Sequence, residues 1–258
     1  MNRFDQRGRR WRVAAVCCVG MMLLCIPPAA RAATVVVPNS LANTQGDFGN
    51  GFPFNIAAFS QTSMRYQQVF AGSQFSALGG PQSITAIAFR TESIAPAFVS
   101  TLSNVQINLS TTAATPDGLS SAFANNVGAN NTVVFGPGPL PLSSASSGGP
   151  PHSFDVIIAL QTAFAYDPSA GNLLLDVRNF GGGSSQQFDA VASTSDSISR
   201  VFTTSSNVNS PTGQPDSIGL IARFTTVALP EPSTLTFIAG APVLLIRRRK
   251  RDIPRLQK

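Results

Sequence analysis

The strongest constraint on the fold is a period-two alternation of apolar and polar residues in the middle of the chain. Val105, Ile107 and Leu109 alternate with polar residues over positions 103–112. Residues 152–160 and 172–180 repeat this pattern. Alternation of this kind places the apolar side chains on one face of a β-strand, whereas a helix needs a period near 3.6. The pattern therefore predicts strands that are buried on one face.

The remaining body of the chain extends this pattern into an all-β prediction. Residues 83–90 and 216–226 are apolar at both alternating positions, which indicates central strands, and shorter strands are expected at 64–70, 132–135, 188–192 and 200–204. Turns rich in Gly, Pro, Asn and Asp separate these segments. About nine such strands without crossover helices predict an antiparallel β-sandwich, jelly-roll-like in topology. The 16 phenylalanines of the body are expected mainly in its core.

Two segments interrupt the strand pattern. Residues 117–128 are compatible with one short surface helix. Residues 136–152, rich in Gly, Pro and Ser, are expected to form a long irregular loop. They could instead mark a domain boundary, but neither half alone has enough strands for a good core. The sequence thus predicts one sandwich domain over residues 33–228, between terminal segments 1–32 and 229–258.

The positive charge of the chain belongs to its two ends. The whole chain has a formal net charge of +6, with six arginines in residues 1–32 and seven Lys or Arg residues in 247–258. Residues 33–229 contain five arginines against nine acidic residues, a net charge of −4. Nucleic-acid binding needs a cationic surface that follows the phosphates. The body offers no such surface, so nucleic acid is not an expected partner.

The N-terminal segment is typical of an export signal. Residues 1–12 are basic, residues 13–26 form an uncharged apolar run of 14 residues, and Ala30 and Ala32 are the small residues of a signal-peptidase site. A buried helix is the alternative, but a run this short behind five arginines favours a signal peptide that ends at Ala32. All three cysteines lie within this segment, so cleavage would leave a protein without thiols or disulfides.

Sequence motifs for catalysis are not found in the body. Its one histidine, His152, stands in a Gly/Pro-rich segment and is expected to be a solvent-exposed loop residue. A single histidine without cysteine cannot form a His-pair zinc site, and no nucleophile-elbow, dinucleotide or P-loop motif occurs. The expectation is a protein that is not an enzyme and holds no cofactor.

Two kinds of ligand remain open at this stage. Asp167, Asp176 and Asp189 lie in or near turns around residues 173–178 and form a weak candidate set for calcium, which needs six to eight oxygen ligands. Sugar sites commonly stack a ring on Trp or Tyr, and the body has only Tyr66 and Tyr166. This scarcity lowers the expectation of sugar binding without excluding it.

Three interpretations of the C-terminal segment are compared: a last core strand, a membrane span and a sorting signal. A strand is disfavoured by Pro230-Glu231-Pro232 and by the basic block that follows the apolar run at 233–246. That run makes about 21 Å of helix, short of the roughly 30 Å of a hydrocarbon core. A basic stop-transfer block holds its cytoplasmic end, composed of Arg247, Arg248, Arg249, Lys250 and Arg251.

This order of features resembles the PEP-CTERM sorting signal of Gram-negative-type bacteria, over about 22 residues. In that family an exosortase, a membrane cysteine transpeptidase, recognises the PEP motif and processes the tail. The resemblance implies a short C-terminal hydrophobic helix, a membrane intermediate and a partner exosortase, together with an association with extracellular polysaccharide and biofilm. The chain departs from the pattern in the seven residues that follow the basic block.

The leading expectation is therefore a non-enzymatic exported protein of the cell surface or extracellular matrix. It would pass through an inner-membrane intermediate and then reach the surface or the medium. The alternative is a carbohydrate-binding or adhesion module of the cell surface or biofilm, and the sequence alone leaves that alternative open.

Overall fold

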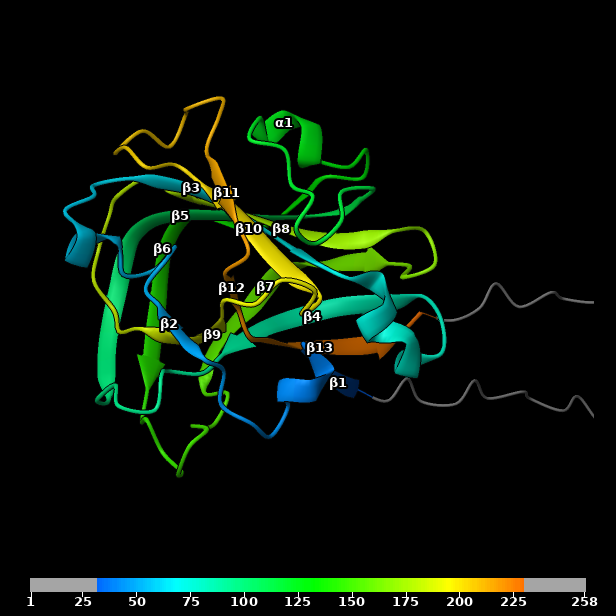
Figure 1. Ribbon diagram of the computed structural model, residues 1–258, viewed down its shortest axis with the longest axis horizontal. Helices are drawn as coiled ribbons and strands as arrows, with labels where there is room; N and C mark the ends of the chain where they lie inside the picture. Colours follow the sequence, from blue (N-terminus) through cyan, green and yellow to red (C-terminus); the bar gives the residue numbers. More distant parts are fainter. Residues whose placement is uncertain (1–31, 230–258) are drawn as a thin grey trace, which may run out of the picture.

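The computed structural model describes residues 32–229, which form several antiparallel sheets packed against one another (Figure 1). Within these residues lie thirteen strands, more than the nine that the sequence predicts, because several are only two to four residues long. The strands are β1 (Ala32–Val37), β2 (Phe48–Asn50), β3 (Met64–Phe70), β4 (Gln82–Phe89), β5 (Phe98–Thr112), β6 (Thr132–Ser144), β7 (Val156–Tyr166), β8 (Asn172–Asn179), β9 (Phe188–Val191), β10 (Ile198–Phe202), β11 (Gln214–Asp216), β12 (Gly219–Leu220) and β13 (Ala222–Ala228).

The strands are arranged in three sheets. A four-stranded sheet has the order β1-β13-β4-β7, and a six-stranded sheet has the order β11-β10-β3-β8-β5-β6. A small sheet, β12-β9-β2, completes the set. Every pairing is antiparallel, so the predicted all-β, antiparallel class is confirmed. In Figure 1 the long strands β5 and β6 curve around one side of the molecule.

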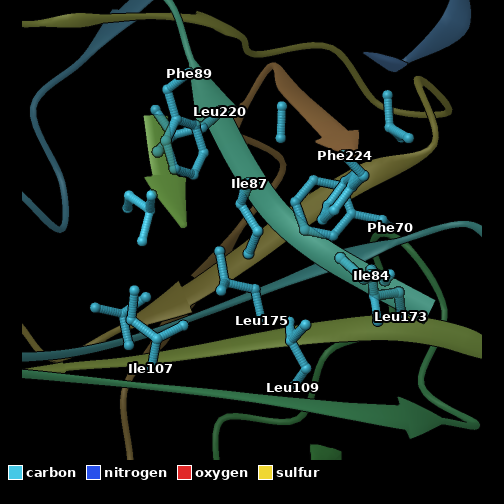
Figure 2. Close-up of a cluster of buried hydrophobic side chains, with 14 of the residues drawn as sticks. Phe70, Ile84, Ile87, Phe89, Ile107, Leu109, Leu173, Leu175, Leu220 and Phe224 are labelled. Atoms are coloured by element: carbon cyan, nitrogen blue, oxygen red, sulfur yellow. The ribbon is translucent and has the colours of Figure 1, made fainter. Parts of the chain in front are cut away.

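The main core fills the space between the two larger sheets. Ile87 and Phe224 from the four-stranded sheet face Leu175 from the six-stranded sheet, and each is almost completely buried (Figure 2). The predicted inward faces are confirmed, since Val105, Ile107 and Leu109 all belong to this core. Ten of the 16 body phenylalanines are buried, which agrees with the expected role of these side chains in packing.

The six-stranded sheet is also covered on its outer face. Leu174 of β8 packs in a second cluster with Phe123, which comes from the short helix α1 (Phe123–Asn126). The predicted surface helix at 117–128 is therefore shorter than expected, with Phe123 and Asn126 buried against the sheet and Ala124 and Asn125 exposed. An α-helix of one turn is stable here because its apolar side chain is buried against the sheet.

The prediction of a long loop over residues 136–152 is wrong for its first half. Residues 136–144 belong to β6, and within them Leu140 and Leu142 are buried while Pro139 and Pro141 are exposed. β6 is an edge strand of its sheet, where a proline without an N–H donor is tolerated. The irregular connection is therefore confined to residues 145–155, between β6 and β7.

The connections contain three 3₁₀ helices. These are η1 (Asn39–Leu41), η2 (Ile56–Phe59) and η3 (Gly72–Leu78). The first follows β1 and lies close to it, whereas the third contributes Phe75 to the main core.

Candidate functional site

The two ends of the described body lie side by side. In the β1–β13 ladder Ala32 is paired with Val227, and the pairing continues to Val37 opposite Ala222. The backbone N–H of Leu229 donates to the carbonyl of Pro81, 3.3 Å away, which holds the last described residue near the start of β4. The segments that precede residue 32 and follow residue 229 therefore join the body at the same end of the β1–β13 ladder.

The predicted sorting and cleavage residues lie mainly outside the described residues. These are Ala30, Pro230, Glu231, Pro232, Arg247, Arg248, Arg249, Lys250 and Arg251, together with both expected terminal helices. Ala32 is described, is exposed and begins β1. A cut after Ala32 would leave Ala33–Val37 paired with β13. Over residues 32–229, no helix has the length and apolar character needed to cross a bilayer.

The structure gives the three calcium candidates different surroundings. Asp167 is half-buried at the start of a turn, where its Oδ1 accepts hydrogen bonds from the N–H and hydroxyl of Ser169, 2.9 and 2.7 Å away. These bonds lower the pKa of the Asp167 carboxyl. Asp176 lies in β8 and is bound by both the Nε and an Nη atom of Arg65.

Asp189 of β9 is the most enclosed of the three. Its Oδ2 accepts from Nε of Arg90 at 2.6 Å, and its Oδ1 accepts from Gln45 and from the N–H of Gly46. Burial raises the pKa of the Asp189 carboxyl, although the Arg90 guanidinium and the N–H of Gly46 act to lower it. The candidates thus have separate partners, and among residues 32–229 no three His, Cys, Asp or Glu side chains gather as a metal site would require.

Neither tyrosine offers an open ring face to a sugar. Tyr66 is fully buried and its hydroxyl donates to Gln68, while Tyr166 is 1% exposed and donates to the carbonyl of Gly171. Burial raises the pKa of both phenols. Both rings are core components, with Tyr166 packed edge-on against Phe75. A sugar site built by stacking on tyrosine is therefore absent from the body.

The prediction for His152 is wrong, because its side chain is only 7% exposed. Its Nδ1 lies 2.8 Å from the hydroxyl of Thr91, a residue just beyond β4. The loop that carries His152 is folded onto the outer face of the four-stranded sheet, where Phe154 packs with Ala88 and Ile221. This long-range contact has no signal in the local Gly/Pro-rich sequence.

The arginines of the body are candidate functional residues that the sequence analysis did not single out. Arg65, Arg90 and Arg200 each pair with an aspartate, whereas Arg178 and Arg223 have no carboxylate partner within the described residues. The body has only five arginines and few other charges, and this scarcity was the one sequence feature that could have drawn attention to them. Charges that interrupt apolar strands need partners or a function, but the partners are too distant in sequence to predict.

Residues 32–229 form a β protein of several antiparallel sheets packed together. Known families and curated proteins do not narrow this class further: no family model matches the chain, and no curated protein matches its sequence.

Proposed function

We propose that this is a non-enzymatic exported protein of the cell surface or extracellular matrix. Residues 1–32 act as the export signal, and residues 229–258 act as a PEP-CTERM-type sorting segment. The motif Pro230-Glu231-Pro232 is recognised by an exosortase-type enzyme, while residues 233–246 and the basic block Arg247–Arg251 hold the chain in the inner membrane until processing.

The observation that carries this proposal is the order of the PEP motif, the apolar run 233–246 and the basic block in a chain that begins with an export signal. The pairing of Ala32 with Val227 is compatible with it. One membrane must receive both the signal and the sorting segment, since the chain is exported N-terminus first and retained by its C-terminus. Attachment points on neighbouring strands allow both segments to reach that membrane while the body stays folded on one side of it.

The proposal also covers the domain organisation and topology of the body. We infer one jelly-roll-like sandwich domain over residues 33–228, since a single core cluster draws side chains from all three sheets. Its exterior carries many Ser, Thr and Asn side chains, which suit contact with a hydrated matrix or with extracellular polysaccharide.

The alternative function is a carbohydrate-binding or adhesion module. The burial of Tyr66 and Tyr166 removes the aromatic-stacking form of this function. A polar, arginine-based form is favoured instead by a cavity on the outer face of the four-stranded sheet, which is described below.

The intact mass of the protein isolated from its native host tests the leading proposal. A mass that lacks residues 1–32 and everything after the PEP motif is expected, and added mass would indicate a glycan or covalent anchor. A mass that still includes residues 247–258 would make the tail a stable membrane anchor, and the sorting proposal would be rejected.

A further inference from the structure

A cavity of about 480 Å³ opens on the outer face of the four-stranded sheet. Val36 of β1 is paired with Arg223 of β13, and Arg223 is paired with Ala88 of β4, so this row of side chains lies opposite the main core. Two connections cover the row, η1 with Leu41 and the β6–β7 loop with Phe154. The cavity therefore lies between a rigid sheet and two loops, in the size range of small-molecule sites.

Arg223 is the cavity residue whose charge has no counterpart. Within residues 32–229 its guanidinium makes one hydrogen bond, from Nη2 to the carbonyl of Phe154 at 2.9 Å, and pairs with no carboxylate. Its Nε is buried and has no acceptor among the same residues. The buried Nε is out of reach of a ligand, so the donor open to a ligand is Nη1, which also has no acceptor among the described residues.

A second guanidinium, that of Arg90, also lines this cavity. Arg90 is 1% exposed, and the carbons Cζ of Arg90 and Arg223 lie 4.7 and 5.4 Å from the centre of the Phe154 ring. Asp189 neutralises Arg90 from behind and does not line the cavity. Among the described residues that line the cavity none is acidic, so Arg223 leaves a net positive charge there.

The remaining polar groups of the cavity can form hydrogen bonds with uncharged groups of a ligand. Nδ1 of His152 is engaged by Thr91, and Nε2 has no hydrogen-bond partner within the described chain. When the Thr91 hydroxyl donates to Nδ1, Nε2 carries the proton and is a donor. The exposed side chains of Asn43 and Ser153 stand at the cavity and can bond hydroxyl groups.

We propose that this cavity binds a small organic carboxylate of about the size of a sugar acid. The planar carboxylate accepts from the guanidinium of Arg223, whose flat fork fits it better than a tetrahedral anion. His152 supplies a further donor, and Asn43 and Ser153 contact the hydroxyl groups of the ligand. The cavity lies wholly within the body, so the proposal stands or falls independently of the sorting segment.

The test is a ligand-observed NMR titration of the full-length protein in detergent with galacturonate and with galactose. These two probes share a ring and differ by the carboxylate. Galacturonate is expected to bind with a Kd below about 10 mM, and galactose at least tenfold more weakly. Equal binding of the two, or no galacturonate binding up to that concentration, overturns the proposal. Tighter binding of inorganic phosphate would overturn the choice of a carboxylate.

Substitutions in the cavity test whether galacturonate binds there. Arg223→Gln should weaken galacturonate binding at least tenfold, whereas Arg178→Gln, the same change at the other arginine without a carboxylate partner, should leave it unchanged. Asn43→Asp should also weaken binding by placing a negative charge at the cavity, and Asn43 is exposed, so this change leaves the packing intact. Unaltered affinity in both Arg223→Gln and Asn43→Asp would place the ligand elsewhere and refute the assignment.

Discussion

Nε of Arg90 donates to Oδ2 of Asp189 across 2.6 Å, and both side chains are essentially sealed from solvent, at 1% and 0% exposure. The pair joins the end of β4 in the four-stranded sheet to β9 in the small sheet. The same guanidinium donates to the carbonyls of Leu41, Ala42 and Thr44 in the connection between β1 and β2. One buried arginine thereby fixes two sheets and a loop.

Removing the acid of this pair should destabilise the protein strongly. Asp189→Ala leaves a buried guanidinium without its counter-charge, and we expect a loss of about 3–5 kcal/mol in the free energy of unfolding. Urea unfolding followed by circular dichroism measures this loss. Asp167→Ala, which removes a turn carboxylate that is bonded only to Ser169, is the control and should lower stability far less than Asp189→Ala. Similar losses in the two variants would contradict a stabilising role for the pair.

The strands with one buried face were predictable, and the reason is local. Val105, Ile107 and Leu109 could be assigned to the buried face because the residues that alternate with them, Asn104, Gln106 and Asn108, are polar and exposed or half-buried. In β8 the alternation of apolar and polar residues does not predict which side chains are buried. Its second face carries Leu174 and Asp176, which were expected to face away from the core, yet both are buried by segments distant in sequence.

The candidate sites were less predictable than the fold, because each depends on contacts across long sequence separations. The Arg65–Asp176 and Arg90–Asp189 pairs join residues 111 and 99 positions apart. His152 is buried by Thr91, 61 positions earlier. The second part of β6, residues 136–144, was missed for a different reason, since its glycines and prolines are turn residues in isolation and are tolerated there only at a sheet edge.

Asp196 should make stability depend on pH. Its Oδ1 accepts from the N–H of Ile198, its Oδ2 is buried without a partner in the described chain, and burial, with Asp117 and Asp47 nearby, raises its pKa to about 6. The unfolded value is 3.8, so the folded state binds more protons between these values. Stability is therefore greatest below pH 3.8 for this group and falls as the pH rises towards 6.

The variant Asp196→Asn has no such proton to lose and keeps an acceptor for Ile198. We expect it to exceed the parent protein in stability at pH 7 by about 1 kcal/mol, a value discounted for the solvent that reaches this site, and to match it near pH 3.5. Thermal unfolding from pH 3.5 to 7.5 measures the difference. A gap that is constant with pH would show that Asp196 titrates normally.

Calcium should have no effect on the stability of the body. The carboxylates of Asp176 and Asp189 are already bound by arginines, and Asp167 is held by Ser169, so none is free to join a set of six to eight oxygens. A ligand that binds the folded state raises the unfolding midpoint. We expect the same midpoint in millimolar calcium and in excess chelator, and a reproducible rise with calcium alone would revive the candidate set.

Glu231 should be required for processing of the tail. The prolines on either side of it disfavour a helix and keep the motif extended, so a processing enzyme can reach the backbone, and the Glu231 carboxylate is the one charge within the motif. In the native host, Glu231→Ala should leave the protein in the membrane fraction with residues 247–258 still present by mass. Asp252→Ala removes an acid from the same segment beyond the basic block and should be processed like the parent protein. Normal processing of Glu231→Ala would refute the role assigned to this carboxylate, whereas failure of both variants would mean that processing depends on the charge of the segment and not on the motif.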